Sequence, residues 1–382
     1  LITSLFFLWG FARAILDVLN KHFQNALDIS LTQSSLIQVT TYLGYFLTAI
    51  PAGWFINRQG YRRGVVFGLA LFALGSLMFI PGAAIGTFYA FLLPLFIIGC
   101  GLVFLETAAN PYASELGDKA TASSRLNFSQ SFNGLGCLFA TYVVGQFLFN
   151  GSNEGGDVVV PYTLLGILVM VIAVVFSRVH LPEIKHEETE EDRIKDTRIM
   201  KLFKHHPMFV FGLFSLLAYE IAEISINSYF INFVTGQGWM DDNSASMVLT
   251  VALGFFMVGR FLGSWIMRRI PAERMLMYCS LGSVSCLGVV LLDIGHWSMY
   301  ALIANYLFEA IMFPTIFSLS LQGLGNLTKS ASSLLMMTPI GGCFFLLMGY
   351  VADQTNLVVP FLIPFIGYFI VLLYASELSR KS

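Results

Sequence analysis

An acid and an amide lie near the end of an apolar stretch that is long enough to cross a membrane. No charge occurs in residues 91–104, and Glu106 follows, with Asn110 one helical turn later. On a helix these side chains share a face, and Pro111 frees the Thr107 carbonyl from its usual hydrogen bond. A charged acid at membrane depth costs at least ~2.5 kcal/mol, so such a residue usually has a function. The alternative is a neutral, purely structural acid bonded to a neighbouring helix.

The first apolar stretch contains a possible ion pair. Arg13 and Asp17 are four residues apart, so their side chains can pair on a helix. A neighbouring cation favours the charged form of an acid, whereas burial favours the neutral form. Asp17 is therefore a candidate proton site whose affinity depends on the position of Arg13. A permanent structural ion pair is the alternative.

Carboxamides recur at helical spacing in a later stretch, as Asn127, Gln130 and Asn133. A carboxamide both donates and accepts hydrogen bonds, which suits a polar solute. We expect this row to face Glu106. The alternative is that these amides only bond neighbouring helices to one another.

The second half of the chain carries a comparable polar face. Glu220, Glu223 and Asn227 fall at positions i, i+3 and i+7, with Tyr219 beside them. Glu223 could accept hydrogen bonds from a bound solute. A cation site, which would favour sodium coupling, and simple interhelical bonding are the alternatives.

Two weaker groups of candidates follow from the same patterns. Asn305 and Glu309 are four residues apart in a later apolar stretch and either form a counterpart of the Glu106 site or pair with a neighbour. Aromatic residues that could stack on the face of a bound solute are Trp9, Tyr219, Tyr229 and Phe308.

The composition is that of a polytopic membrane protein. Apolar residues make up 56 % of the chain and charged residues only 12 %, against ~25 % in soluble domains. A net charge of -2 gives no indication of a nucleic-acid partner. The five cysteines all fall within apolar stretches, where they are expected to pack rather than to bind metal or form disulfides. No nucleophile, metal cluster or phosphate loop of recognisable spacing indicates an enzyme or a cofactor.

Twelve apolar spans can be delimited by charges, Gly/Pro pairs and polar clusters. We predict an all-α integral membrane protein with spans at 2–24, 34–56, 63–82, 85–112, 125–149, 159–181, 207–235, 244–268, 273–293, 296–322, 330–351 and 357–378. The long hydrophilic connection divides the chain into an N-terminal six-helix bundle (1–181), a linker (182–206) and a C-terminal six-helix bundle (207–382).

The distribution of positive charge predicts the orientation. Eighteen of the 21 Lys and Arg residues fall in the connections on one side or near the C-terminus, and the opposite connections 150–158, 236–243 and 352–356 have none. Since positive loops stay in the cytoplasm, both termini and the linker are expected there.

The two halves repeat each other. Gly53 precedes Arg58 by five residues, and Gly263 precedes Arg268 by the same interval at the matching place in the second half. A duplicated six-helix unit is typical of a transporter whose site lies at the midplane between the halves. We expect alternating access by rocking of the two bundles.

The loop at 53–63 resembles the cytoplasmic signature loop of the major facilitator superfamily. Within it, the motifs at 5–10, 106–111, 125–130, 259–263 and 314–319, together with Asp17, resemble the fucose:proton symporter family, which includes bacterial glucose/galactose permeases. The similarity covers essentially the whole chain. One departure is that Arg13 and Ala14 stand where the fucose permease has two asparagines.

The resemblance implies proton-coupled uptake of a hexose or deoxyhexose across the bacterial inner membrane, with L-fucose favoured over galactose and glucose. Asp17 would carry the proton, and Glu106 would bind sugar and couple its occupancy to Asp17. From its spacing, Arg13 is expected to set the proton affinity of Asp17. The expected sugar contacts are Glu106, Gln130, Asn110, Asn127, Glu223, Tyr219 and Asn227. We expect a monomer in the lipid bilayer.

Four arginines are expected to serve the cytoplasmic gate through charge pairs and helix ends, without touching sugar: Arg58, Arg62, Arg260 and Arg268. The sequence is also compatible with four other functions. They are a sodium-coupled hexose transporter, a drug:proton antiporter, a non-transporting sugar sensor and, with least support, a membrane-embedded enzyme.

Overall fold

A computed structural model describes residues 2–27, 29–115, 122–149, 159–178, 202–267, 269–324, 331 and 334–381, with the side chains of some helical residues left undescribed. Every regular element in these ranges is a helix. The first set comprises α1 (Ile2–Leu27), α2 (Leu31–Ser34), α3 (Leu36–Gln59), α4 (Tyr61–Leu77), α5 (Phe79–Ile85), η1 (Phe88–Phe91), α6 (Leu92–Glu115), α7 (Ala122–Phe149) and α8 (Val159–Arg178).

The second set begins after the hydrophilic connection. It comprises α10 (Pro207–Gly236), α11 (Asp242–Ile266), α12 (Ala272–Leu291), α13 (His296–Glu309), α14 (Met312–Leu321), η5 (Thr338–Phe344), α16 (Phe345–Gln354), η6 (Val359–Phe361) and α17 (Leu362–Lys381). Each predicted span coincides with one helix or with consecutive helices. Eight helical stretches in the described ranges are long and apolar enough to cross a membrane, and α1 and α8 contain shorter apolar stretches.

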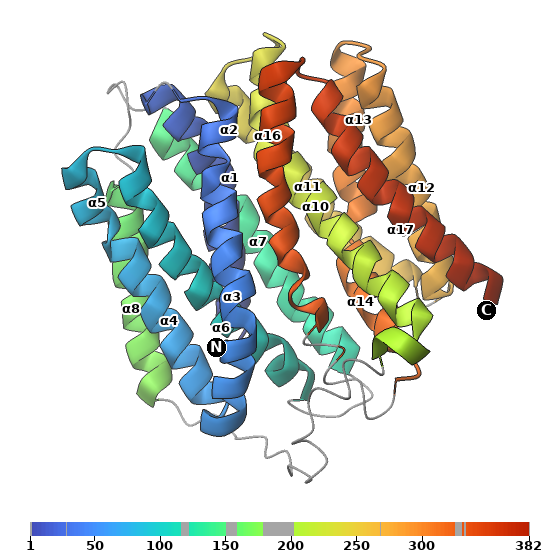
Figure 1. Cartoon of the computed structure of the whole chain (residues 1–382), viewed down its shortest axis with the longest axis horizontal. Coiled ribbons are helices and arrows are strands. Elements are labelled where there is room, and N and C mark those ends of the chain that lie inside the picture. Colours follow the sequence, from blue (N-terminus) through green and yellow to red (C-terminus); the bar gives the residue numbers. More distant parts are fainter. Residues whose placement is uncertain are drawn as a thin grey trace.

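The buried apolar side chains form two cores, as expected for two helical bundles. One core draws on residues between 5 and 176 with Ile224, and the other on residues between 202 and 375 with Leu31. Figure 1 shows α4, α5 and α8 at one side of the molecule and α12, α13 and α17 at the other. Most of the linker lies outside the described residues, so the domain boundaries stay a prediction.

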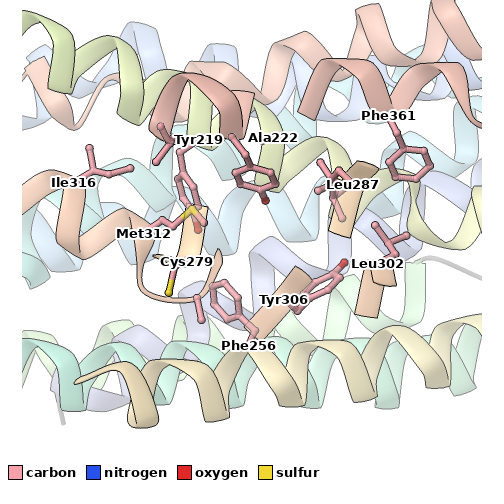
Figure 2. Packing of buried hydrophobic residues seen from close by; sticks show 14 of the residues in the cluster. Tyr219, Ala222, Phe256, Cys279, Leu287, Leu302, Tyr306, Met312, Ile316 and Phe361 are labelled. Carbon is pink, nitrogen blue, oxygen red and sulfur yellow. The ribbon is translucent and has the colours of Figure 1, made fainter. Parts of the chain in front are cut away.

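The second core is rich in large side chains from helices far apart in the sequence. Figure 2 shows Phe256 of α11, Tyr306 of α13 and Met312 of α14 gathered below Tyr219 of α10. All four side chains are buried. This packing fixes α10 in place, and with it the polar face predicted on that helix.

Glycine allows α1 and α7 to pack backbone against backbone. A Cβ on Gly136 would lie 2.1 Å from the Phe7 carbonyl oxygen, and one on Gly10 would lie 2.1 Å from that of Asn133. Small residues permit such close approach in membrane helices. The contact holds the polar residues of α1 and α7 at the same depth in the molecule.

Proline interrupts the span that contains α13 and α14. Pro314 has no N–H, so it leaves the Ala310 carbonyl without its helical partner. The helix breaks between Glu309 and Met312. The freed carbonyl accepts a hydrogen bond from Arg260 Nε at 3.2 Å. The break thereby binds an arginine of α11 at the centre of the molecule.

Candidate functional site

A cavity lies at the centre of the molecule, between residues of both sets of helices. Its wall combines acids, arginines, amides and aromatic rings. The lining residues are Trp9 and Arg13 of α1, Tyr42 and Tyr45 of α3, Glu106 of α6, Gln130 and Asn133 of α7, Tyr219, Glu220 and Glu223 of α10, Arg260 of α11, Phe313 of α14 and Pro339 of η5.

The cavity is contracted in this conformation. The space that the centre of a water-sized sphere can occupy is about 20 Å³. The cavity can therefore hold water but no larger solute. A hexose therefore cannot enter unless the walls move apart. The structure represents a closed form of the site.

Arg13 joins the two sets of helices across this cavity. Its Nη2 donates to Glu223 Oε2 at 2.7 Å and lies 3.4 Å from Glu220 Oε2. We define these three residues as the Arg13 bridge. The sequence suggested Asp17 as the partner of Arg13, whereas the observed partners lie on α10. The side chain of Asp17 lies outside the described residues, so its own pairing is not tested.

The observed partners of Arg13 come from tertiary packing, which local spacing on α1 does not indicate. A spacing of four residues makes Asp17 available to Arg13, but α10 brings two carboxylates into the cavity. One of them approaches to the distance of a charge-assisted hydrogen bond. Tertiary contacts of this kind are invisible in the local spacing of α1.

Arg260 lies in the cavity wall rather than at the cytoplasmic end, where the sequence analysis expected a gate. Its Nη1 lies 3.3 Å from the Gln130 carbonyl oxygen and 3.4 Å from the Gln130 side-chain oxygen. Its guanidinium also lies over the Phe256 ring, 4.5 Å from the centroid. The reason for this placement is the proline break, which offers the Ala310 carbonyl at mid-helix.

Glu106 lines the cavity and is 5 % exposed. Within the described part of the chain it forms no hydrogen bond or ion pair. Its carboxylate is therefore available to a bound solute. The side chain of Asn110, predicted to share its face, lies outside the described residues, as does that of Asn127.

Gln130 and Asn133 both reach the cavity from α7. Asn133 Nδ2 also donates to the Phe6 carbonyl at 3.3 Å, which ties α7 to α1. The amide row thus combines the two interpretations that the sequence left open. Asn133 bonds a neighbouring helix, and both amides border the site.

Tyr219 borders the cavity with its ring and turns its hydroxyl away. That hydroxyl donates to the Glu309 carbonyl at 3.3 Å. Asn227 does not reach the lining, because four residues of helix carry it ~6 Å beyond Glu223 along α10. The sequence had placed both beside the sugar, and the closed cavity brings only Tyr219 there.

Glu309 lies in the second core and not at the cavity. Asn305 Nδ2 donates to its Oε2 at 2.7 Å, and the Tyr368 hydroxyl donates to the same oxygen. The side chain is 0 % exposed. Of the two interpretations of this acid, the contacts favour pairing with its neighbours.

The remaining gate candidates lie at helix ends. Arg58 lies over the Trp54 ring at 4.2 Å from the centroid, and Arg62 Nη2 donates to the Ser177 carbonyl. Neither forms an ion pair with an acid in the ranges described, and Arg268 lies outside those ranges. Their role in a gate stays a prediction.

Four residues line the cavity that the sequence did not single out: Tyr42, Tyr45, Phe313 and Pro339. Tyr42 and Tyr45 are three residues apart on α3, a spacing that puts two polar aromatic side chains on one face. That signal was present but is common in apolar helices. Nothing in the local sequence of Pro339 indicates a place at the cavity.

Comparison with known proteins decides the family. The sequence profile of the Major Facilitator Superfamily matches residues 2–345. The chain belongs to the major facilitator superfamily. It is 34 % identical to a glucose/galactose transporter of Brucella abortus, over 100 % of this chain and 93 % of that protein. It is 32 % identical to the L-fucose-proton symporter of Escherichia coli, over 100 % of this chain and 93 % of that protein.

The fold agrees with solved structures of the superfamily. A crystal structure of the transporter FucP in the outward conformation aligns with a TM-score of 0.79 and 31 % identity, covering 98 % of this chain and 97 % of that one. A partially occluded inward-open xylose transporter of Escherichia coli aligns with a TM-score of 0.75 at 13 % identity, a likeness of fold alone. The all-α, two-bundle architecture of a major facilitator is thus confirmed.

Proposed function

We propose that this major facilitator is a proton-coupled symporter that takes up a hexose or deoxyhexose, with L-fucose favoured and galactose or glucose next. The observation that carries this proposal is the closed polar cavity between the bundles. Acids, amides and arginines in one wall suit a solute with many hydroxyls. The names of the relatives, an L-fucose-proton symporter and glucose/galactose transporters, support the same substrate class.

Sugar recognition is assigned to the cavity wall. Glu106 accepts from hydroxyls, and Gln130 both donates and accepts. Glu223 and the ring of Tyr219 complete the contact from the second bundle. Asn110 and Asn127, whose side chains lie outside the described residues, are proposed as further contacts, and Asn227 lies farther along α10. Arg260 is an additional donor that the sequence analysis did not include.

Proton coupling is assigned to Asp17, Glu106 and Arg13. A proton on Asp17 would remove a bare charge, which is costly to move through the membrane. A proton carried with a neutral sugar would use the membrane potential, worth ~2.3 kcal/mol per charge per 100 mV. No resident cofactor is needed, because the proton gradient supplies the energy.

The cycle is alternating access of two six-helix bundles around the cavity. Arg58, Arg62 and Arg268 are proposed to act at the cytoplasmic gate, and Arg260 to link that movement to the cavity. The protein would work as a monomer in the bacterial inner membrane, with both termini in the cytoplasm. It would carry out no catalysis.

The test is a hexose panel in proteoliposomes made with the full chain. Labelled L-fucose, galactose, glucose and amino sugars are offered with an inward proton gradient, an inward sodium gradient or neither. We expect accumulation with the proton gradient and exchange without any gradient. Accumulation with the sodium gradient alone would show that sodium, and not the proton, is the coupled ion. Sugar binding without flux would show that the protein is a sensor. Export of apolar cations without hexose competition would establish an antiporter instead.

A further inference from the structure

The charges that line the cavity do not balance. Three carboxylates, Glu106, Glu220 and Glu223, face two guanidiniums, Arg13 and Arg260. With every group in its ordinary form, one negative charge is left over. A buried charge without a partner is expensive at this depth.

The excess charge is concentrated at the Arg13 bridge. A single nitrogen, Arg13 Nη2, contacts Glu223 at 2.7 Å and Glu220 at 3.4 Å. The two acids have side-chain exposures of only 9 % and 3 %, so water screens their mutual repulsion poorly. Adjacent like charges disfavour double ionisation, and the bridge therefore holds two acids with one cation.

The bridge also closes the site mechanically. Arg13 belongs to α1 and both acids belong to α10, so the ion pairs draw the two bundles together across a cavity too small for a hexose. Admitting the sugar requires α1 and α10 to separate. When they separate, Arg13 leaves and both carboxylates lose their cation.

We propose that Glu220 and Glu223 form a proton-binding pair of the transport cycle, which Arg13 covers until sugar enters. This rests on the proposed sugar symport. Sugar entry uncovers the pair, and a proton from external water forms an O–H bond with one carboxylate. After inward opening and sugar release, Arg13 returns, the O–H bond breaks and the proton leaves to internal water. No other reactant takes part.

The described surroundings of the pair contain two other acids, Glu106 and Glu309. Arg13 of α1, Tyr42 and Tyr45 of α3, Glu106 of α6 and Arg260 of α11 line the same cavity, with Tyr219 on the helix of the pair. Cys137 of α7 donates to the Gly10 carbonyl, one turn before Arg13, and Glu309, which accepts from Tyr368, lies within electrostatic reach of Glu223. The side chain of Asp17, on α1, lies outside the described residues. This proton-linked step is separate from the role proposed for Asp17.

By linkage, sugar and proton favour each other's binding. For one linked proton the sugar Kd rises up to ~tenfold per pH unit as pH increases. Removing either acid leaves a one-to-one pair with Arg13 that is neutral without a proton. Glu220→Gln is the sharper choice, because Glu223 is also assigned to sugar. The sugar affinity of this variant should lose the part of its pH dependence that comes from the pair.

The experiment measures three quantities on the full chain in detergent and proteoliposomes. They are the Kd for L-fucose, galactose and glucose across pH, proton uptake on sugar addition followed with a pH indicator, and accumulation driven by a pH gradient. In Glu220→Gln we expect proton uptake to fall by one proton per sugar and driven accumulation to weaken, while gradient-free exchange persists. The matched control is Glu273→Gln, an acid in the first turn of α12 that does not line the cavity, and it should keep all three.

A second variant keeps the proposal testable if Glu220→Gln does not fold. Arg13→Gln removes the cover, so the pair should hold its proton before sugar arrives. Sugar then binds with a flatter pH profile, and the pair takes up no further proton. Wild-type coupling in both variants would overturn the proton-binding pair alone. Absence of sugar exchange in the wild type would instead overturn the proposed function on which the pair rests.

Discussion

Arg13 of α1 and Glu223 of α10 meet at 2.7 Å, although 210 residues separate them in the chain. The contact crosses the central cavity, and Glu220 approaches the same nitrogen. A fixed ion pair at this point would keep a hexose out. The contact must therefore break in each transport cycle, and transport properties should depend on it.

Glu106 is the acid with most freedom to bind a solute. Replacement by Gln keeps its size and removes the charge that strengthens hydrogen bonds from hydroxyls. Such bonds are worth ~1.5–3 kcal/mol, so the sugar Kd should rise ~10-fold to 100-fold. Titration calorimetry with the sugar that is transported gives the value. Binding and exchange at wild-type strength would refute the assignment of Glu106 to the sugar site.

Arg260 links α11 to the proline break and to Gln130. Lys in its place cannot reach the Ala310 carbonyl and the two Gln130 oxygens together, since it lacks the planar fork of donors. Losing buried charge-assisted bonds costs ~1.5–3 kcal/mol. We expect Arg260→Lys to lower the melting temperature and to weaken sugar binding. Arg58→Lys, which changes a ring contact at a helix end, is the control and should leave sugar affinity unaltered.

The packing of α1 against α7 gives a stability prediction with an internal control. In Gly136→Ala the new methyl would meet the Phe7 carbonyl oxygen at 2.1 Å, so the helices must shift. Overpacking of this kind costs ~1–3 kcal/mol. Gly53→Ala adds a methyl with nothing within 4 Å. Thermal unfolding in detergent should show a lower midpoint for the first variant only; equal midpoints would contradict the close α1–α7 contact.

The helices were predictable because each span must be apolar over about twenty residues. The polar faces of α7 and α10 were predictable for a related reason, since side chains at helical spacing share a face. Gln130 and Glu223 reached the cavity as that spacing indicates. Spacing within one helix therefore predicts which side chains face the site together.

Contacts between the bundles were not predictable in the same way. Arg13 has an acid four residues away on its own helix, yet its observed partners are on α10. Arg260 looked like one of several arginines near a helix end, and only the carbonyl freed by Pro314 explains its central position. Both placements depend on how distant helices approach, which no local pattern encodes.

The end of the molecule opposite the predicted cytoplasmic loops holds a contact between α2 and α16. Asp353 Oδ2 accepts from the Thr32 backbone N–H at 3.0 Å and from the Thr32 hydroxyl. Asp353 belongs to the second set of helices and Thr32 to the first. In the closed state this carboxylate therefore ties the two bundles together at their outer ends.

Removing that carboxylate should shift the protein toward the outward-open state. Spin labels at Ile85 and Leu292, both exposed at the ends of α5 and α12, report the separation of the bundles by pulsed electron paramagnetic resonance. In Asp353→Ala the distances should lengthen, because hydrogen bonds to an ionised group, worth up to ~1.5–3 kcal/mol, are lost. Asp293→Asn is the matched control, since Asp293 bonds Gln237 at 3.3 Å within one bundle. Unchanged distances in Asp353→Ala would mean that this contact does not hold the outer ends closed.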